Sequence, residues 1–148
     1  MTTATESKTD LIAKELEHIA DANGGVLQPE KVVAFAQNPD TALHDQFEWD
    51  DTEAARKYRL DQAREVIRLR VTIIPHKEET IRAYVSLTTD RGVPGGGYRK
   101  TLDVISDEER FKQMLADARG ELQSFRRKYA ILQELAPVFT AMEEVFTA

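Results

Sequence analysis

Positive charge is concentrated in the middle of this chain. Residues 54–77 contain seven lysines and arginines against two acids, whereas residues 1–53 contain twelve acids and three bases. Guanidinium and ammonium groups gathered in this way can bind phosphates or carboxylates. The net charge of the 148-residue chain is −6. This charge argues against a protein that coats nucleic acid with its whole surface, but it allows one basic face to bind a polyanion.

The other polar residues predict no catalytic site, metal site or cofactor. The chain has no cysteine, its three histidines stand at no metal-ligand spacing, and its serines lie in no nucleophile motif. A Walker-type phosphate loop requires lysine after its last glycine, and this sequence has Tyr98 after Gly97. We therefore expect a binding protein, not an enzyme.

The basic stretch itself predicts a helix followed by a β-hairpin. Thr52 is the expected N-cap of the helix. The expected core face of this helix consists of Ala55, Tyr58, Ala63, Val66 and Ile67. Residues 70–74 are β-branched, residues 75–79 form a polar turn, and residues 81–87 alternate between apolar and polar side chains, which together predict two paired strands.

Two further helices are expected before the basic one. Thr9 can cap a helix that starts at Asp10 and ends at the glycines of 23–25, and its apolar residues recur at helical spacing. Pro29 suits the first turn of a second helix, which residues 38–40 should end. A short apolar pair lies between the two helices, and residues 41–50 should pack on the domain.

The order helix, short strand, helix, helix, strand, turn, strand over residues 10–89 resembles the winged helix-turn-helix family. The resemblance implies that the third helix enters the DNA major groove and that the hairpin touches the backbone or minor groove. It would make Lys57, Arg64 and Arg68 groove or phosphate contacts. The stretch FEWDD at 47–51 resembles small accessory proteins encoded by tailed phages.

The C-terminal third predicts one long helix. Ser106 and Glu109 form a capping box, and apolar residues then follow at heptad spacing from Phe111 to Phe139, with a kink or break expected at Pro137. A helix from Asp107 to Ala136 would be about 45 Å long at 1.5 Å per residue. Such a helix should either fold back or meet another chain, and we favour a dimer.

The predicted fold class is α+β and mostly helical: an N-terminal winged helix-turn-helix followed by long C-terminal helices. The predicted divisions are a disordered tail (1–9), a winged-helix domain (10–89), a glycine-rich loop (90–105) and a helical oligomerisation region (106–148). The loop is expected either to be a flexible connection or to touch DNA as a second arm. No stretch is long and apolar enough to span a membrane, and the first residues are no secretory signal, so we expect a cytoplasmic protein, in the host cytoplasm if phage-encoded.

The predicted function is largely nonspecific binding of double-stranded DNA by an oligomer. The alternative is a protein–protein adaptor, such as a phage assembly or host-takeover factor, that uses the winged helix as a scaffold. The predicted DNA contacts are Arg56, Lys57, Arg59, Arg64, Arg68, Arg70, Lys77, Arg91, Arg99 and Lys100. The predicted oligomerisation residues are Phe111, Leu115, Leu122, Phe125, Tyr129 and Leu132.

Overall fold

The computed structural model describes residues 6–50 and 52–148, and it confirms an α+β fold that is mostly helical. The α-helices are α1 (Lys8–Ala22), α2 (Pro29–Ala36), α3 (Glu53–Arg68), α4 (Thr88–Arg91), α5 (Thr101–Ser106), α6 (Glu108–Tyr129) and α7 (Ala136–Thr147). The strands are β1 (Val26–Leu27), β2 (Val71–Ile73), β3 (Thr80–Arg82), β4 (Tyr84–Val85) and β5 (Tyr98–Lys100). Two short 3₁₀ turns are η1 (His44–Gln46) and η2 (Gln133–Leu135).

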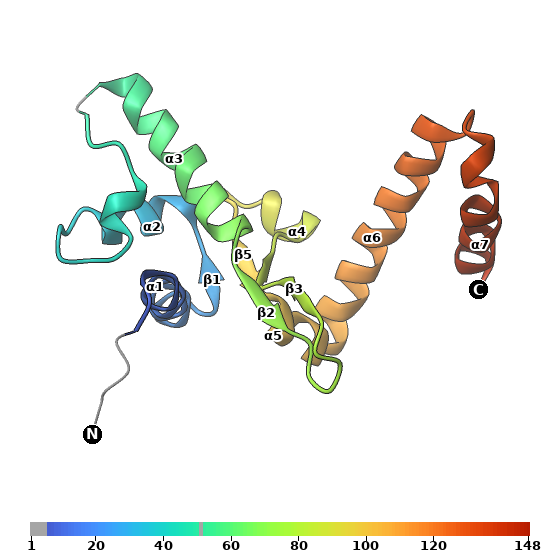
Figure 1. Ribbon diagram of the computed structural model, residues 1–148, viewed down its shortest axis with the longest axis horizontal. Coiled ribbons are helices and arrows are strands. Elements are labelled where there is room, and N and C mark those ends of the chain that lie inside the picture. The colour runs from blue at the N-terminus through green and yellow to red at the C-terminus, as the bar shows by residue number, and fades with distance from the viewer. Residues whose placement is uncertain (1–5, 51) are drawn as a thin grey trace.

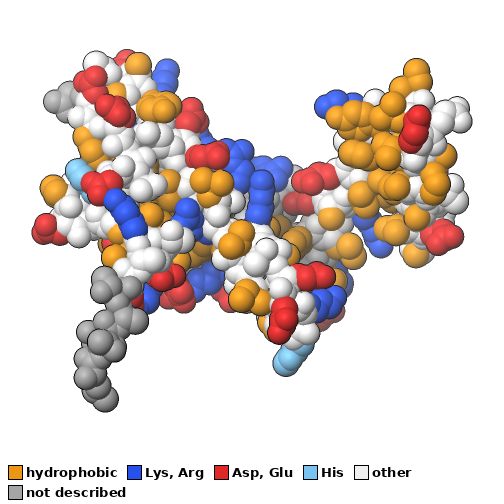
Figure 2. Space-filling model, in the orientation of Figure 1, with side chains coloured by type: hydrophobic (Ala, Val, Ile, Leu, Met, Phe, Trp, Pro, Cys, Tyr) orange, Lys and Arg blue, Asp and Glu red, His pale blue; other side chains and the backbone are white. Residues whose placement is uncertain are grey.

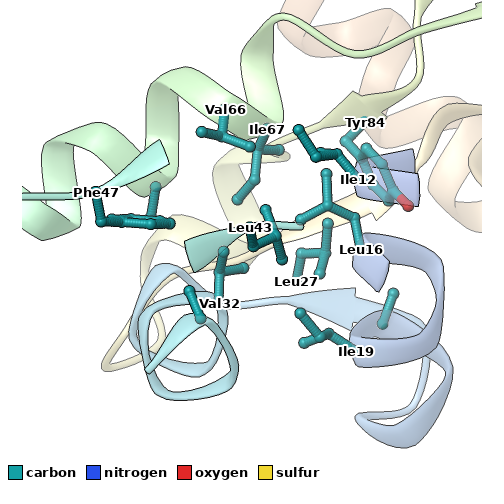
Figure 3. Close-up of a cluster of buried hydrophobic side chains, with 13 residues drawn as sticks. Ile12, Leu16, Ile19, Leu27, Val32, Leu43, Phe47, Val66, Ile67 and Tyr84 are labelled. Atoms are coloured by element: carbon teal, nitrogen blue, oxygen red, sulfur yellow. The ribbon is translucent and has the colours of Figure 1, made fainter. Parts of the chain in front are cut away.

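The hydrophobic core lies where α1, α2 and α3 meet β1 and β4 (Figure 3). Ile12, Leu16 and Ile19 recur on one face of α1, and all three are buried. They pack with Leu27 of β1 and with Ile67 of α3. The spacing of apolar residues along each helix therefore decides which face of the helix lies in the core.

Strand β5 joins distant parts of the chain. It is the middle strand of a three-stranded antiparallel sheet, with β1 on one side and β4 on the other. Arg99 is opposite both Val26 and Val85 in this sheet. The backbone at Gly97, just before β5, passes close to β1: a Cβ atom added to Gly97 would lie 2.5 Å from the Val26 side chain. Only glycine fits at this position without a shift of its neighbours.

Strands β2 and β3 form a separate antiparallel hairpin. The predicted single strand over 81–87 is instead two short strands, because the pairing changes partner at Ala83. The Ala83 N–H donates to the Arg70 carbonyl beside the hairpin, and the Ala83 carbonyl accepts from Thr101 N–H beside the sheet. The two sheets are thus linked through one residue.

Several predicted boundaries are wrong at the N-terminal side. Helix α1 begins at Lys8 with Ser7 as its cap, whose hydroxyl accepts from Asp10 N–H, so Thr9 is helical and is not a cap. The predicted disordered tail (1–9) therefore overlaps a helix, and its first five residues lie outside the described part of the chain. Tyr58 is 55% exposed, so it does not belong to the core face of α3.

The predicted glycine-rich loop (90–105) is also too long. It includes the end of α4, all of β5 and most of α5, and only residues 92–97 between α4 and β5 lie outside helices and strands. The pairing of Tyr98–Lys100 with two strands from elsewhere in the chain gives this segment its structure.

The predicted long C-terminal helix is wrong in its length and its cap. Asp107, not Ser106, caps α6, because its carboxylate accepts from Arg110 N–H. Helix α6 ends at Tyr129, and α7 starts with Pro137 in its first turn and runs back beside α6 (Figure 1). Phe125 and Phe139 pack together with ring centroids 6.4 Å apart. The C-terminal third is therefore a helical hairpin that projects from the domain.

Replacing Leu16 with alanine should lower the free energy of unfolding by about 2–5 kcal/mol, because its fully buried side chain would leave a cavity. The matched control is Ile131→Ala, at a position that is 86% exposed, with an expected change within about 0.5 kcal/mol. Urea unfolding followed by circular dichroism measures both. Equal losses in the two variants would contradict the core described above.

Candidate nucleic-acid interface

A hollow of about 810 Å³ opens between α3, the β3–β4 segment, the turn of residues 92–97 and α6. Its most prominent feature is a group of four arginines from three elements: Arg64 and Arg68 of α3, Arg82 of β3 and Arg91 of α4. Figure 2 shows lysine and arginine side chains gathered between α3 and α6. Guanidinium groups of this kind can hold anionic oxygen atoms.

Helix α3 presents Arg64 and Arg68 on the face that borders its buried residues. The two arginines are four positions apart, so they lie on one face, while Ala63 and Ile67 point into the core. Arg64 pairs with Asp61 at 2.8 Å, and Arg68 pairs with Glu65. Each side chain of these two pairs is 45–72% exposed, so water screens both interactions. A phosphate could therefore replace either carboxylate.

Arg82 and Arg91 complete the basic wall of the hollow. Arg82 lies on β3 opposite Val71 of β2, and its side chain is exposed. Arg91 ends α4 and donates to the Ser86 carbonyl at 2.9 Å, which holds its guanidinium beside β4. Sequence reasoning missed Arg82 as a site residue. The available signal was its polar position in the alternating stretch 81–87.

Helix α4 is fastened to α6 by hydrogen bonds. Asp117 accepts from the Thr88 backbone N–H at 2.9 Å and from the Thr88 hydroxyl at 2.7 Å. These bonds hold the pKa of the Asp117 carboxyl below its usual value. Thr89 donates in addition to Gln113 at 3.0 Å. The position of Arg91 thus depends on side chains of α6.

A half-buried ion pair fastens α4 to the central strand. Arg99 of β5 donates two hydrogen bonds to the Asp90 carboxylate, at 2.8 and 2.9 Å. The two side chains are 20% and 14% exposed. This two-point geometry fixes the direction of α4 more firmly than a single contact would.

The hollow is also lined by acidic side chains. Asp117 and Glu121 line it from α6, and Glu30 lines it from α2. Within residues 6–50 and 52–148, no ion pair joins these three carboxylates to the four arginines. The carboxylates share the hollow with the arginines, and the charge of Arg91 helps to lower the pKa of Asp117.

Four predicted DNA contacts are held in bonds within the protein and lie away from the hollow. Arg59 donates to the carbonyls of Glu48 and Asp50 at 3.1 and 2.7 Å, and it lies 5.3 Å from the centre of the Trp49 ring. Arg70, just after α3, donates to the Val66 carbonyl of that helix at 3.2 Å, and Arg99 donates to Asp90 as described above. Lys100 binds Glu17 and Asp21 at 3.1 and 3.0 Å. Its burial would lower its pKa, but these two carboxylates raise it above its usual value.

The remaining predicted DNA contacts are exposed and lie outside the hollow. Arg56 and Lys57 are near the start of α3, and Lys77 is in the turn between β2 and β3. The structure therefore brings Arg64, Arg68 and Arg91 together and leaves these three apart. Whether any of the ten contacts DNA stays a prediction.

The predicted oligomerisation residues fall into two groups. Phe111, Leu115, Phe125 and Leu132 are each 40–46% exposed, although they are large and apolar. Leu122 and Tyr129 are half-buried. Figure 2 shows apolar side chains over much of the surface formed by α6 and α7.

In the part of the chain that the structure describes, no cluster of three or more histidine, aspartate or glutamate side chains could hold a metal ion. Within the same residues, no helix combines the length and apolar character needed to cross a membrane.

Comparison of the chain with protein-family models, with curated proteins and with solved structures finds no match. The functional proposals below therefore rest on the sequence and the geometry of this chain alone.

Replacing Asp117 with alanine should speed hydrogen exchange at the Thr88 amide, because that N–H loses its acceptor. Glu109→Ala, at an exposed position in the first turn of α6, is the control and should leave Thr88 unchanged. The pKa of Asp117 is lower in the folded protein than in the unfolded chain, where it is about 3.9. The hydrogen bonds to Thr88 therefore contribute their full stability to the folded protein above that value. This contribution is lost as the pH falls through the folded pKa. Equal exchange at Thr88 in parent and Asp117→Ala would contradict this attachment.

Proposed function

We propose that this protein binds double-stranded DNA largely without regard to sequence, by holding phosphates with its basic surface. The observation that carries the proposal is the convergence of four arginines from α3, β3 and α4 on one hollow, in a chain whose net charge is −6. Arginine forms paired hydrogen bonds with phosphate, and phosphate contacts carry no sequence information.

The arrangement of elements around the hollow is consistent with a winged helix-turn-helix role. Helix α3 is the third helix of the first domain, and the β2–β3 hairpin follows it directly. By the family resemblance, Lys57, Arg64 and Arg68 would contact a groove or its phosphates, and Arg56 would extend the basic face. The acidic N-terminal region would repel DNA and so favour docking on this one side.

Self-association through α6 and α7 belongs to the same proposal. None of the 22 residues of α6 is buried, and in α7 only Met142 is. A two-helix hairpin leaves one apolar side of each helix without a partner, and the hairpin of a second copy would cover it in a four-helix bundle. Joining two weak DNA sites raises the effective concentration of the second contact.

A second candidate function is that of a protein–protein adaptor. The exposed apolar side chains of the helical hairpin favour it, since Ile131 is 86% exposed and Val138 46%. Patches of this kind mark protein interaction sites, and the partner need not be a second copy. In this case the arginine hollow would bind a carboxylate-rich partner.

The first test is binding to random-sequence duplex DNA at two salt concentrations. If four arginines each neutralise one phosphate, the logarithm of the binding constant should fall with the logarithm of the salt concentration, with a slope of roughly −3 to −4 per site.

Charge reversal of Arg64 and Arg68 to glutamate should abolish this binding and leave the fold intact, because both side chains are exposed.

The control for this variant is Lys14→Glu with Lys31→Glu. It changes the net charge by the same amount at exposed positions of α1 and α2 that do not line the hollow. It should therefore retain most of the affinity. Folded parent protein that causes no shift at micromolar concentration in low salt would end the DNA proposal, and equal losses in both variants would remove the hollow as its site.

The test of self-association uses Val138→Asp with Val145→Asp. These residues are seven positions apart on the outer side of α7, 46% and 41% exposed, so the change should spare the folded monomer. Light scattering should give a multiple of 16.8 kDa for the parent and a lower mass for the variant. Thr140→Asp, on the same helix, is the control. A parent that scatters as a monomer at tens of micromolar would exclude the dimer.

A further inference from the structure

The arginine hollow has the volume of a site for one small molecule. Pockets of about 300–1,000 Å³ enclose ligands of that size, and this hollow measures about 810 Å³. Helices α2, α3, α4 and α6 and strands β3, β4 and β5 all contribute to its lining. A DNA duplex is a convex rod, and each of its internal phosphates lies between two sugars. Internal phosphates can therefore reach only the opening of the hollow, whereas the end of a strand can enter it.

Three arginines of the hollow are free to turn toward a ligand. Among the described residues, none forms an ion pair with Arg82, whose side chain is exposed. Arg64 and Arg68 pair only with exposed carboxylates three positions earlier on α3. Pairs of this kind contribute little to stability, so a ligand can replace them. Like charges around one hollow repel each other, and a doubly charged anion would relieve this repulsion.

The carboxylates of the hollow restrict how many phosphates can enter. Glu30 and Glu121 are exposed and line the hollow from α2 and α6. A strand that ran through the hollow would carry successive phosphates past these side chains, which would repel them. A strand that ends in the hollow brings one phosphate group. A terminal phosphate is a monoester with a charge of about −1.5 to −2 at pH 7, whereas each internal phosphate carries a single charge.

We propose that the arginine hollow binds the terminal phosphate of a DNA strand, so that the protein prefers phosphorylated DNA ends to the interior of a duplex. The inference rests on the proposed DNA binding and identifies the part of the DNA that enters this site. Internal phosphates would then be held by exposed basic residues outside the hollow, such as Arg56 and Lys57.

The glycine turn leaves room for such an end. Gly95 and Gly96 line the hollow with φ values of 86° and 60°, which residues other than glycine rarely adopt. A Cβ atom on Gly96 would meet no atom within 4 Å. The main chain is bare at this point of the lining, so a ligand can approach it closely.

The experiment compares three short duplexes of one sequence, whose strands end in 5′-phosphates, in 3′-phosphates or in hydroxyl groups alone. At least one phosphorylated duplex should bind the parent about tenfold to a hundredfold more tightly than the hydroxyl-ended duplex. This is the range that one hydrogen bond to a charged group contributes. Fluorescence anisotropy titration measures all three dissociation constants, and deoxyadenosine monophosphate serves as a competitor.

Arg82→Gln tests the hollow as the place where the end binds. It should bring the affinity for the phosphorylated duplexes close to that for the hydroxyl-ended duplex, and it should leave the fold intact because the side chain is exposed. The matched control is Lys31→Gln. This variant loses the same charge at an exposed position of α2 that does not line the hollow, so it should keep the preference.

The possible results separate the two proposals. Equal binding of all three duplexes by the parent would overturn the terminal-phosphate site and leave duplex binding in place. A parent that binds none of them overturns both proposals. An Arg82→Gln variant that is folded and keeps the preference would show that the end binds elsewhere, which overturns the inference. Deoxyadenosine monophosphate that binds as tightly as the phosphorylated duplex would show that the hollow takes a free nucleotide, which overturns it as well.

Discussion

The pairing of β5 with both β1 and β4 is the constraint on which the rest of the structure depends. This strand brings Tyr98–Lys100 beside Val26–Leu27, more than seventy positions earlier in the chain. It also directs Arg99 toward Asp90 and Lys100 toward α1. Without this strand the β3–β4 segment would lose its partner in the sheet, and α4 would lose one of its two attachments. The arginine hollow has its shape because β5 sets where α4 lies.

The basic residues of this chain have different roles, and the sequence alone does not distinguish them. Some arginines and lysines stabilise the fold, as Arg59 does over Trp49 and Arg99 does with Asp90. Others, such as Arg64 and Arg68, have only exposed partners on their own helix. Removing one partner of a half-buried, two-point ion pair destabilises the protein, whereas an exposed pair contributes little to stability and can exchange with a ligand. Burial therefore separates the arginines that stabilise the fold from those proposed to bind a ligand.

The helical hairpin of α6 and α7 is coupled to the hollow through α4. Asp117 and Gln113 of α6 hold Thr88 and Thr89, while the same helix also carries the exposed side chains of Phe111, Leu115 and Phe125. One helix thus lines the proposed DNA site and also carries the surface proposed for self-association. Two copies joined through this hairpin would present their hollows in a fixed relation, which is the geometry that two-site binding requires.

The sequence by itself determined the local elements: the helices at α1, α2 and α3, the cap at Thr52, the turn between β2 and β3, and the concentration of basic charge. These follow from apolar period, caps and turn residues, which act over a few positions. Tertiary structure decided that Tyr98–Lys100 is a strand, that Tyr58 is exposed and that the chain turns back after Tyr129. It also decided that Arg82 joins Arg64, Arg68 and Arg91, while Arg59 and Arg99 serve the fold. Strand pairing across more than seventy positions and competition among equivalent arginines for partners depend on contacts far apart in the chain, which no local pattern records.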